Sequence, residues 1–174
     1  MATPQSIDRA LATCLEEQRV NDALDLMAAW DHHRGLVWWG CLSAWSCWRP
    51  EPGPQEDRAL QYANQWVETR EDAARRVAGQ AIAETASVPA NLLLKAVFYS
   101  GGSISGEDQP AVEPSPQVCG KFILALLHHL LAGAPLPQRP AQGQRFIELA
   151  RQTLAAYGSV AAPAAYVPAT AAVC

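Results

Sequence analysis

Apolar side chains recur every three or four residues over most of this chain, which is the spacing of one face of an α-helix. Five residues near the N-terminus share such a face: Ile7, Ala10, Leu11, Cys14 and Leu15. The same period predicts further helices over residues 20–30, 31–48, 55–68, 74–85, 91–99, 117–132 and 146–157. Ser6 and Asp31 stand where each could cap a helix, because a short polar side chain can accept a hydrogen bond from a first-turn N–H group. The pattern predicts an all-α, single-domain bundle of seven to eight helices.

Glycine and proline interrupt this pattern at two important places. Gly101 follows the helix predicted over 91–99 and stands where a left-handed residue would end it. The Gly- and Pro-rich segment 101–116 is long for a loop in a single domain, and loops of such length tend to be functional or mobile. We expect one helical domain over residues 1–157. Residues 158–174 are rich in Ala and Pro and carry no charge, so we expect a disordered or loosely packed tail.

Composition narrows the classes of partner. The chain has 174 residues and a formal net charge of −4, which disfavours nucleic acid as a partner because no general basic field attracts phosphates. The longest strongly apolar run, 122–127, falls far short of the roughly 20 residues that span a bilayer, so no membrane insertion is expected. No secretory signal is readable at the N-terminus, and the five scattered cysteines are typical of reduced, mostly buried thiols. These features predict a cytoplasmic protein.

Two histidine pairs, at 32–33 and 128–129, raise the question of a metal site. Adjacent residues on a helix point about 100° apart, so neither pair can chelate a metal from one face. No CxxC or HxxxH spacing supplies further ligands. We therefore interpret the histidines as structural or surface residues, and predict neither a metal nor another cofactor.

The glycine-rich run at 101–106 resembles two catalytic loops without matching either. A phosphate-binding loop needs a lysine after its last glycine, whereas Glu107 and Asp108 follow here. The surroundings of Ser103 nearly spell the GxSxG motif of a hydrolase, but Ser105 replaces the closing glycine. Turn chemistry is the favoured interpretation. A small hydrolase or metal-dependent enzyme that uses the 100–108 loop or the histidine pairs stays open as the alternative.

Tryptophan is concentrated in one short region, because five of the six lie between residues 30 and 48. A helix that is apolar nearly all round is typical of the middle of a bundle, so a core helix is the favoured interpretation and Trp39 is expected to be buried. In the competing interpretation, some of these indoles anchor a protein interface, and Trp48 at the end of the helix is the strongest candidate. The candidate interaction residues are Trp48, Ser100, Gly101, Gly102, Ser103 and Ile104.

Two motifs carry a resemblance to a known family: the run VWWGCL at 37–42, and the run FYSGGSI at 98–104 followed by a Pro-rich loop. Over about residues 20–130 the chain resembles an uncharacterised family of small, all-helical bacterial proteins, a domain of unknown function associated with type VI secretion gene neighbourhoods. The resemblance implies no catalytic residue. It implies an adaptor or effector chaperone of a bacterial secretion system, so we predict a non-catalytic module whose partner is another protein.

Overall fold

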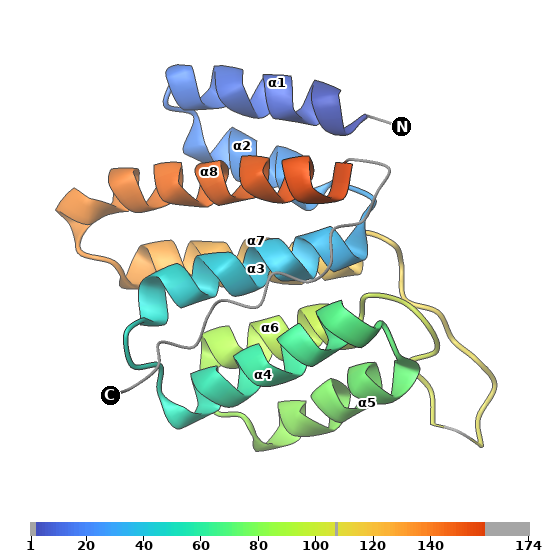
Figure 1. Ribbon diagram of the computed structural model, residues 1–174. Helices are drawn as coiled ribbons and strands as arrows, with labels where there is room; N and C mark the ends of the chain where they lie inside the picture. Colours follow the sequence, from blue (N-terminus) through green and yellow to red (C-terminus); the bar gives the residue numbers. More distant parts are fainter. Residues whose placement is uncertain (1–2, 107, 159–174) are drawn as a thin grey trace, which may run out of the picture.

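Eight α-helices form the part of the chain that the computed structural model describes, residues 3–106 and 108–158 (Figure 1). The helices are α1 (Pro4–Glu16), α2 (Val20–Ala28), α3 (His33–Trp48), α4 (Pro54–Thr69), α5 (Asp72–Ala81), α6 (Val88–Phe98), α7 (Val118–Gly133) and α8 (Arg139–Gly158). Two short 3-10 helices, η1 (Ile82–Glu84) and η2 (Leu136–Gln138), follow α5 and precede α8. No strand occurs within these described ranges, and the all-α prediction is confirmed.

The helices are arranged around a central pair, α3 and α7 (Figure 1). On one side of this pair lie α8, α2 and α1, and on the other lie α4, α6 and α5. Helix α3 packs on α4, α6, α7 and α8, so it contacts both groups. The helix with the highest tryptophan content therefore lies at the centre of the bundle.

Close contacts between neighbouring helices explain two of the glycines. A Cβ atom at Gly120 in α7 would lie 1.9 Å from the carbonyl oxygen of Ala28, so only glycine lets α7 approach the end of α2. A Cβ atom at Gly40 would lie 2.6 Å from Ile123 Cδ1, where α3 crosses α7. Small residues at these crossings allow the central helices to pack closely, which increases the dispersion contacts in the core.

Trp39 confirms the predicted core position. Its side chain is 0 % exposed, and its indole N–H donates to the carbonyl oxygen of Phe146 in α8 at 2.9 Å. The buried indole therefore has a partner for its one polar group, which avoids the cost of an unpaired donor. Trp39 joins α3 to α8 both by packing and by this hydrogen bond.

Several helix ends differ from the prediction. Thr3, not Ser6, caps α1, since its side chain accepts from the N–H of Ser6 at 3.2 Å. His32, not Asp31, caps α3, with Nδ1 accepting from the N–H of Gly35 at 3.0 Å. Histidine is an uncommon cap, so a rule built on short polar side chains does not find it.

The last helix begins earlier than predicted, because Arg139 and Pro140 belong to its first turn rather than to a loop. Proline suits a first turn, where no N–H group is required. The helix ends at Gly158, so the predicted tail begins with a helical residue. Its other residues, 159–174, lie outside the described part of the chain. Within the described ranges, no helix is both long and apolar enough to cross a membrane.

Candidate functional site

The loop between α6 and α7 was the first sequence candidate, and its two ends are joined by one histidine of α3. Nδ1 of His33 is hydrogen-bonded to the carbonyl oxygen of Ser100, and its Nε2 lies 2.8 Å from the carbonyl oxygen of Pro116. Carbonyl oxygens only accept, so both bonds form together when both ring nitrogens carry a hydrogen. The side chain of His33 thus holds the loop at residues 100 and 116.

A buried arginine of α5 holds the same loop from another side. Arg75 is 3 % exposed, and it donates to the carbonyl oxygens of Phe98 and Ser103, each at 2.8 Å. Its guanidinium lies over the Phe98 ring, 5.2 Å from the centroid. The adjacent Arg76 donates to the carbonyl oxygen of Ser105 at 3.2 Å. The loop backbone is therefore fixed by two arginines that precede it by some 25 residues in the sequence.

One carboxylate orients both arginines. Asp72 accepts from Nε and Nη2 of Arg75 at 2.8 and 2.6 Å, and from Nε of Arg76 at 2.7 Å. Partial burial of Asp72 alone would raise its pKa, but the hydrogen bonds and charges of the two arginines outweigh that effect and hold the pKa below its ordinary value. Asp72 is therefore ionised at neutral pH and keeps the pair of arginines aimed at the loop.

The predicted interaction residues of the loop lie beside these arginine contacts. Ser100 is 5 % exposed, and its hydroxyl donates to the carbonyl oxygen of Val97 at 2.6 Å. Oγ of Ser103 accepts from the N–H groups of Ser105 and Val112, and the N–H of Ile104 donates to the carbonyl oxygen of Val112 at 2.9 Å. These contacts give the polar groups of Ser100 and Ser103 internal partners.

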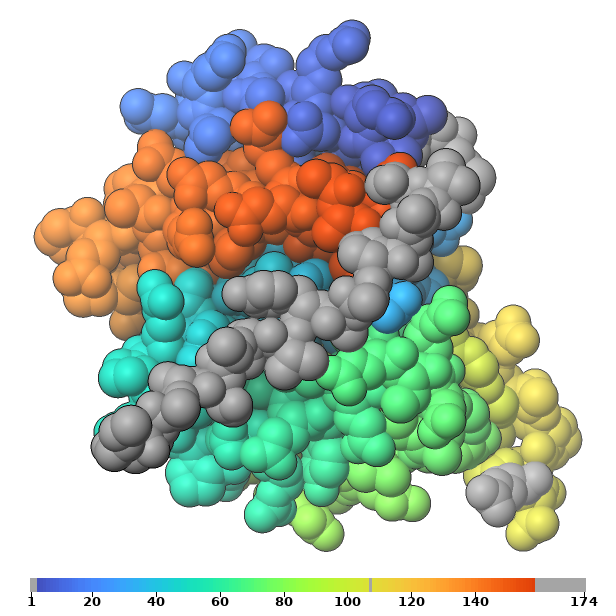
Figure 2. Space-filling view, in the orientation of Figure 1, coloured from blue at the N-terminus to red at the C-terminus, as the bar shows by residue number. Residues whose placement is uncertain are grey.

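The glycines and the outer part of the loop differ in conformation and exposure from the base of the loop, which Arg75, Arg76 and His33 contact. Gly102, rather than Gly101, is the left-handed residue, with φ of 65°. It is exposed, whereas Gly101 and Ile104 are half-buried. Residues 108–113 are all exposed, and this part of the loop projects from the edge of the molecule (Figure 2).

Trp48 lies far from that loop along α3. The loop contacts His33 at the start of the helix, whereas Trp48 is its last residue, about 22 Å further on at 1.5 Å per residue. Trp48 is half-buried and packs against the core. The structure therefore brings Ser100, Gly101, Gly102, Ser103 and Ile104 together, and does not bring Trp48 to them.

A surface that the sequence reasoning did not single out lies on α3 itself. We call the α3 face the set Arg34, Trp38, Leu42, Trp45 and Arg49. Its members are three or four residues apart and so share one side of the helix. Trp45 is 38 % exposed, the most exposed of the six tryptophans, while Trp38 and Leu42 are half-buried. The face lies between α4 and α8, which pack on either side of α3 (Figure 1).

The sequence did contain a signal for this face. Arginines at 34 and 49 bracket the three apolar residues at helical spacing, and long charged side chains prefer the solvent side of a helix. The density of tryptophan concealed this signal, because the whole segment 36–48 appears uniformly apolar.

The start of the α3 face lies beside the end of α8. The guanidinium carbon of Arg34 is 5.4 Å from the centroid of the Tyr157 ring, and that ring also leans on His32 at 5.3 Å. Nε of Arg34 donates to the carbonyl oxygen of Val67 in α4 at 2.6 Å. Arg34 therefore joins α3 to both neighbouring helices, and the chain leaves α8 next to this residue.

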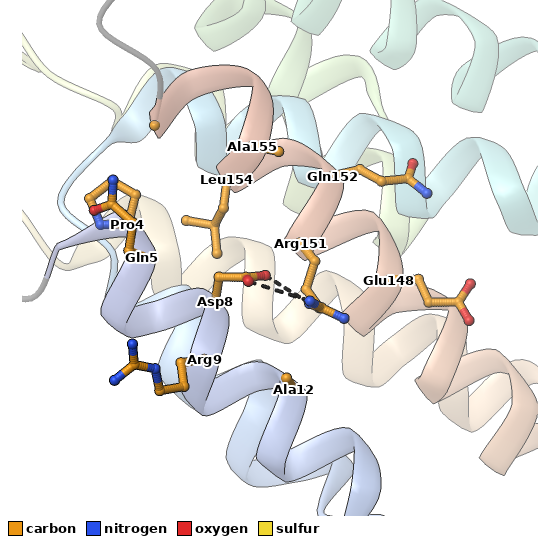
Figure 3. Close-up of a pocket in the computed structure, with 11 residues that line it drawn as sticks. Pro4, Gln5, Asp8, Arg9, Ala12, Glu148, Arg151, Gln152, Leu154 and Ala155 are labelled. Atoms are coloured by element: carbon orange, nitrogen blue, oxygen red, sulfur yellow. Dashed lines mark hydrogen bonds and ion pairs between the residues drawn. The ribbon is translucent and has the colours of Figure 1, made fainter.

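A groove between α1 and α8 hollows the surface elsewhere (Figure 3). Asp8 and Arg151 form an ion pair across it, with Nε–Oδ1 and Nη2–Oδ2 distances of 2.7 and 3.3 Å. Arg9 and Glu148 also line the groove. Because these charges alternate in sign and one pair is already bonded, the groove is best explained as the seam where α1 docks on α8.

The remaining histidines were the other candidate metal ligands. His32 stacks on Trp30, with ring centroids 4.8 Å apart, and burial lowers its pKa. His128 and His129 are exposed on α7. Within residues 3–106 and 108–158, no three His, Cys, Asp or Glu side chains are grouped as ligands for a metal ion.

The cysteines in the described part of the chain are mostly inside the protein, as predicted. Cys14, Cys41 and Cys119 are buried, and burial raises the pKa of Cys41 and of Cys119 to about 12. Such thiols are not ionised at neutral pH and react slowly. Cys174 lies outside the described residues.

Comparison with known proteins gives a family. A family model matches residues 10–154, most of the chain, and the chain belongs to this family of unknown function, DUF6931. The expectation of an uncharacterised family is confirmed, and the match extends beyond residues 20–130 on both sides. No curated protein and no solved structure matches the chain significantly.

Proposed function

We propose that this member of DUF6931 is a protein-interaction module that binds an apolar segment of a partner protein on the α3 face. One observation carries the proposal: the buried side of α3 is packed on four helices, yet Trp38, Leu42 and Trp45 on the opposite side stay partly exposed. Indoles supply large, rigid contact area and dominate many protein interfaces. Partner binding would complete the burial of a helix that is apolar nearly all round.

The charges at the two ends of the face indicate the kind of segment that fits. Arg49 is exposed and Arg34 is half-buried, and the two bracket the apolar residues. A partner segment with apolar residues between carboxylates would match both features, because opposite charges at the rim of an interface favour correct docking. The proposed partner is therefore a protein segment, and not nucleic acid.

The motif resemblance supports a more specific role as an adaptor or effector chaperone of a bacterial secretion system. A chaperone of this kind holds an apolar segment of its client, which is the kind of ligand that the α3 face accommodates. The bacterial origin, the secretion role and the cytoplasmic location rest on the sequence alone.

The contacts of the loop do not favour the alternative of a hydrolase. Oγ of Ser103 accepts two backbone hydrogen bonds, and both ring nitrogens of His33 contact carbonyl oxygens. A serine nucleophile needs a base that accepts its proton, and the described partners of Ser103 are N–H donors. The loop contacts act on backbone position rather than on a reacting group.

A pair of matched variants tests the proposal. Trp45 and Val77 are 38 % and 39 % exposed, and Val77 lies on α5, on the other side of α4 and α6. A photo-crosslinking amino acid at position 45, in full-length protein in its native cells, should capture a partner that the same amino acid at position 77 does not.

Binding to the purified partner then gives the quantitative test. Trp45→Asp should weaken binding by tenfold or more, about 1.4 kcal/mol, whereas Val77→Asp should leave it unchanged. Both variants should melt near the parent temperature. Equal binding by the two variants, or capture at position 77 alone, would contradict the proposal.

A further inference from the structure

We propose that the C-terminal segment of the same chain, residues 159–174, occupies the α3 face when no partner is bound. The inference rests on the proposed function, because it uses the same surface. It begins from the position of Tyr157, whose ring lies over Arg34, the first residue of that face. The segment therefore starts beside the surface that it is proposed to cover.

Length is sufficient for this docking. From Arg34 to Arg49 the helix advances about 22 Å, and an extended chain covers that distance in about seven residues at 3.3 Å each. The segment has sixteen residues. Tyr166, eight residues beyond Gly158, can reach past Trp45 with slack, so it is the residue that we assign to the contact with that indole.

The composition of residues 159–174 suits the apolar α3 face. Residues 159–174 carry no charge, and most of them are Ala, Val or Pro. Pro163 and Pro168 have no N–H group to satisfy, so they suit an extended segment that lies on a helix without pairing to a strand. An uncharged segment gains most by covering apolar side chains, which on this side of the protein are Trp38, Leu42 and Trp45.

The groove between α1 and α8 also lies beside Gly158, and it fits this segment less well. Asp8, Arg9, Glu148 and Arg151 line that groove. An uncharged segment lying there would take water from these charged groups without offering a charge in return, which costs free energy. The apolar α3 face is thus the better match of the two surfaces near the end of α8.

Docking in the same chain would set a threshold for partner binding. A tethered segment is present at an effective concentration in the millimolar range, so even a weak contact is occupied most of the time. A partner segment must then displace residues 159–174 from the α3 face. In this proposal residues 159–174 and the partner segment compete for the same α3 face.

Crosslinking in the purified full-length chain tests this inference without any partner. A photo-crosslinking amino acid with an aromatic side chain is placed at position 45, so that an aromatic ring remains there to contact Tyr166, or, as the control, at position 77. The segment is long enough to reach either position, about 50 Å if fully extended, so reach alone predicts similar yields. Docking on the α3 face predicts about tenfold more crosslinking to residues 160–168 from position 45, because tethering raises occupancy only where a contact exists.

Two further measurements complete the test. Tyr166→Ser should lower the crosslink yield from position 45 severalfold while leaving the yield from position 77 unchanged. An equal mixture of isotopically heavy and light chains should give no mixed crosslinks, because the segment docks in its own chain. Equal yields from the two positions, no effect of Tyr166→Ser, or mixed crosslinks that reveal a second copy would each overturn the inference. None of these results bears on partner capture in cells, so failure here is distinguishable from failure of the proposed function.

Discussion

The loop between α6 and α7 and the α3 face differ in how far their side chains and backbone groups find partners within the protein. The carbonyl oxygens of Phe98 at the end of α6 and of Ser100, Ser103 and Pro116 in the loop are bound by Arg75 or His33, so the base of the loop has partners within the protein. On the α3 face, Trp45 and its neighbours keep apolar surface in solvent. An irregular, glycine-rich segment can thus have its polar groups paired within the protein, while a regular helix leaves apolar side chains partly exposed.

The largest expected effect on stability comes from the buried side of α3. Trp39→Ala should lower the free energy of unfolding by about 3 to 5 kcal/mol, because it opens a cavity where α3 meets α8. It also removes the indole N–H that donates to the carbonyl oxygen of Phe146. Urea or guanidinium unfolding measures the change.

Trp39→Phe serves as the matched control for that variant. It keeps most of the volume and loses the indole N–H, so it should cost about 1 to 2 kcal/mol. A Trp39→Ala variant that unfolds like the parent would mean that the inner side of α3 is not the core.

The contacts of Arg75 and Arg76 with the loop give the next largest expected effect on stability. Arg75→Met should cost about 3 kcal/mol, because the carbonyl oxygens of Phe98 and Ser103 lose a buried donor and Asp72 loses a partner. Arg76→Met removes a more exposed guanidinium with one weaker loop contact, and should cost under about 1 kcal/mol. Chemical unfolding gives both values, and protease cleavage within 101–116 should accelerate only for Arg75→Met. Similar behaviour of the two variants would show that the buried Arg75 does not hold the loop.

Sequence reasoning reached the fold because the helical period is strong and proline and glycine mark the breaks. It placed Trp39 in the core because its helix is apolar nearly all round, and it expected mostly buried thiols because the cysteines are scattered and odd in number. It did not find the contacts of Arg75 and His33 with the loop, because these residues are far from the loop in the sequence. Buried arginines are also rare, so the residue type at position 75 favours a surface position. It selected Trp48 over Trp45 because position at a helix end was considered, whereas the packing of α4 and α8 around α3 decides exposure.

Protonation of Asp72, which orients the two arginines, should have a smaller effect on stability. The pKa of Asp72 is lower in the folded protein than its ordinary value of 3.8, since the arginines outweigh the effect of burial. A depressed folded pKa stabilises the protein above the unfolded value, and this contribution is lost as the pH falls through 3.8 toward the folded pKa. Asp72→Asn should therefore be less stable than the parent at pH 7, and the difference should shrink near pH 3. Urea unfolding at the two pH values measures it, and a difference that grows in acid would contradict the ion-pair explanation.

The smallest expected effect on stability belongs to the exposed indole. Trp45→Ala should lower the free energy of unfolding by only about 1 kcal/mol, because Trp45 is the most exposed of the six tryptophans. Trp48→Ala should cost more, about 1 to 3 kcal/mol, since Trp48 is half-buried and packs against the core. Thermal melts followed by circular dichroism compare the two. If Trp45→Ala destabilised the protein as much as Trp48→Ala, the α3 face would be part of the core packing, and the interaction surface built on it would have to be abandoned.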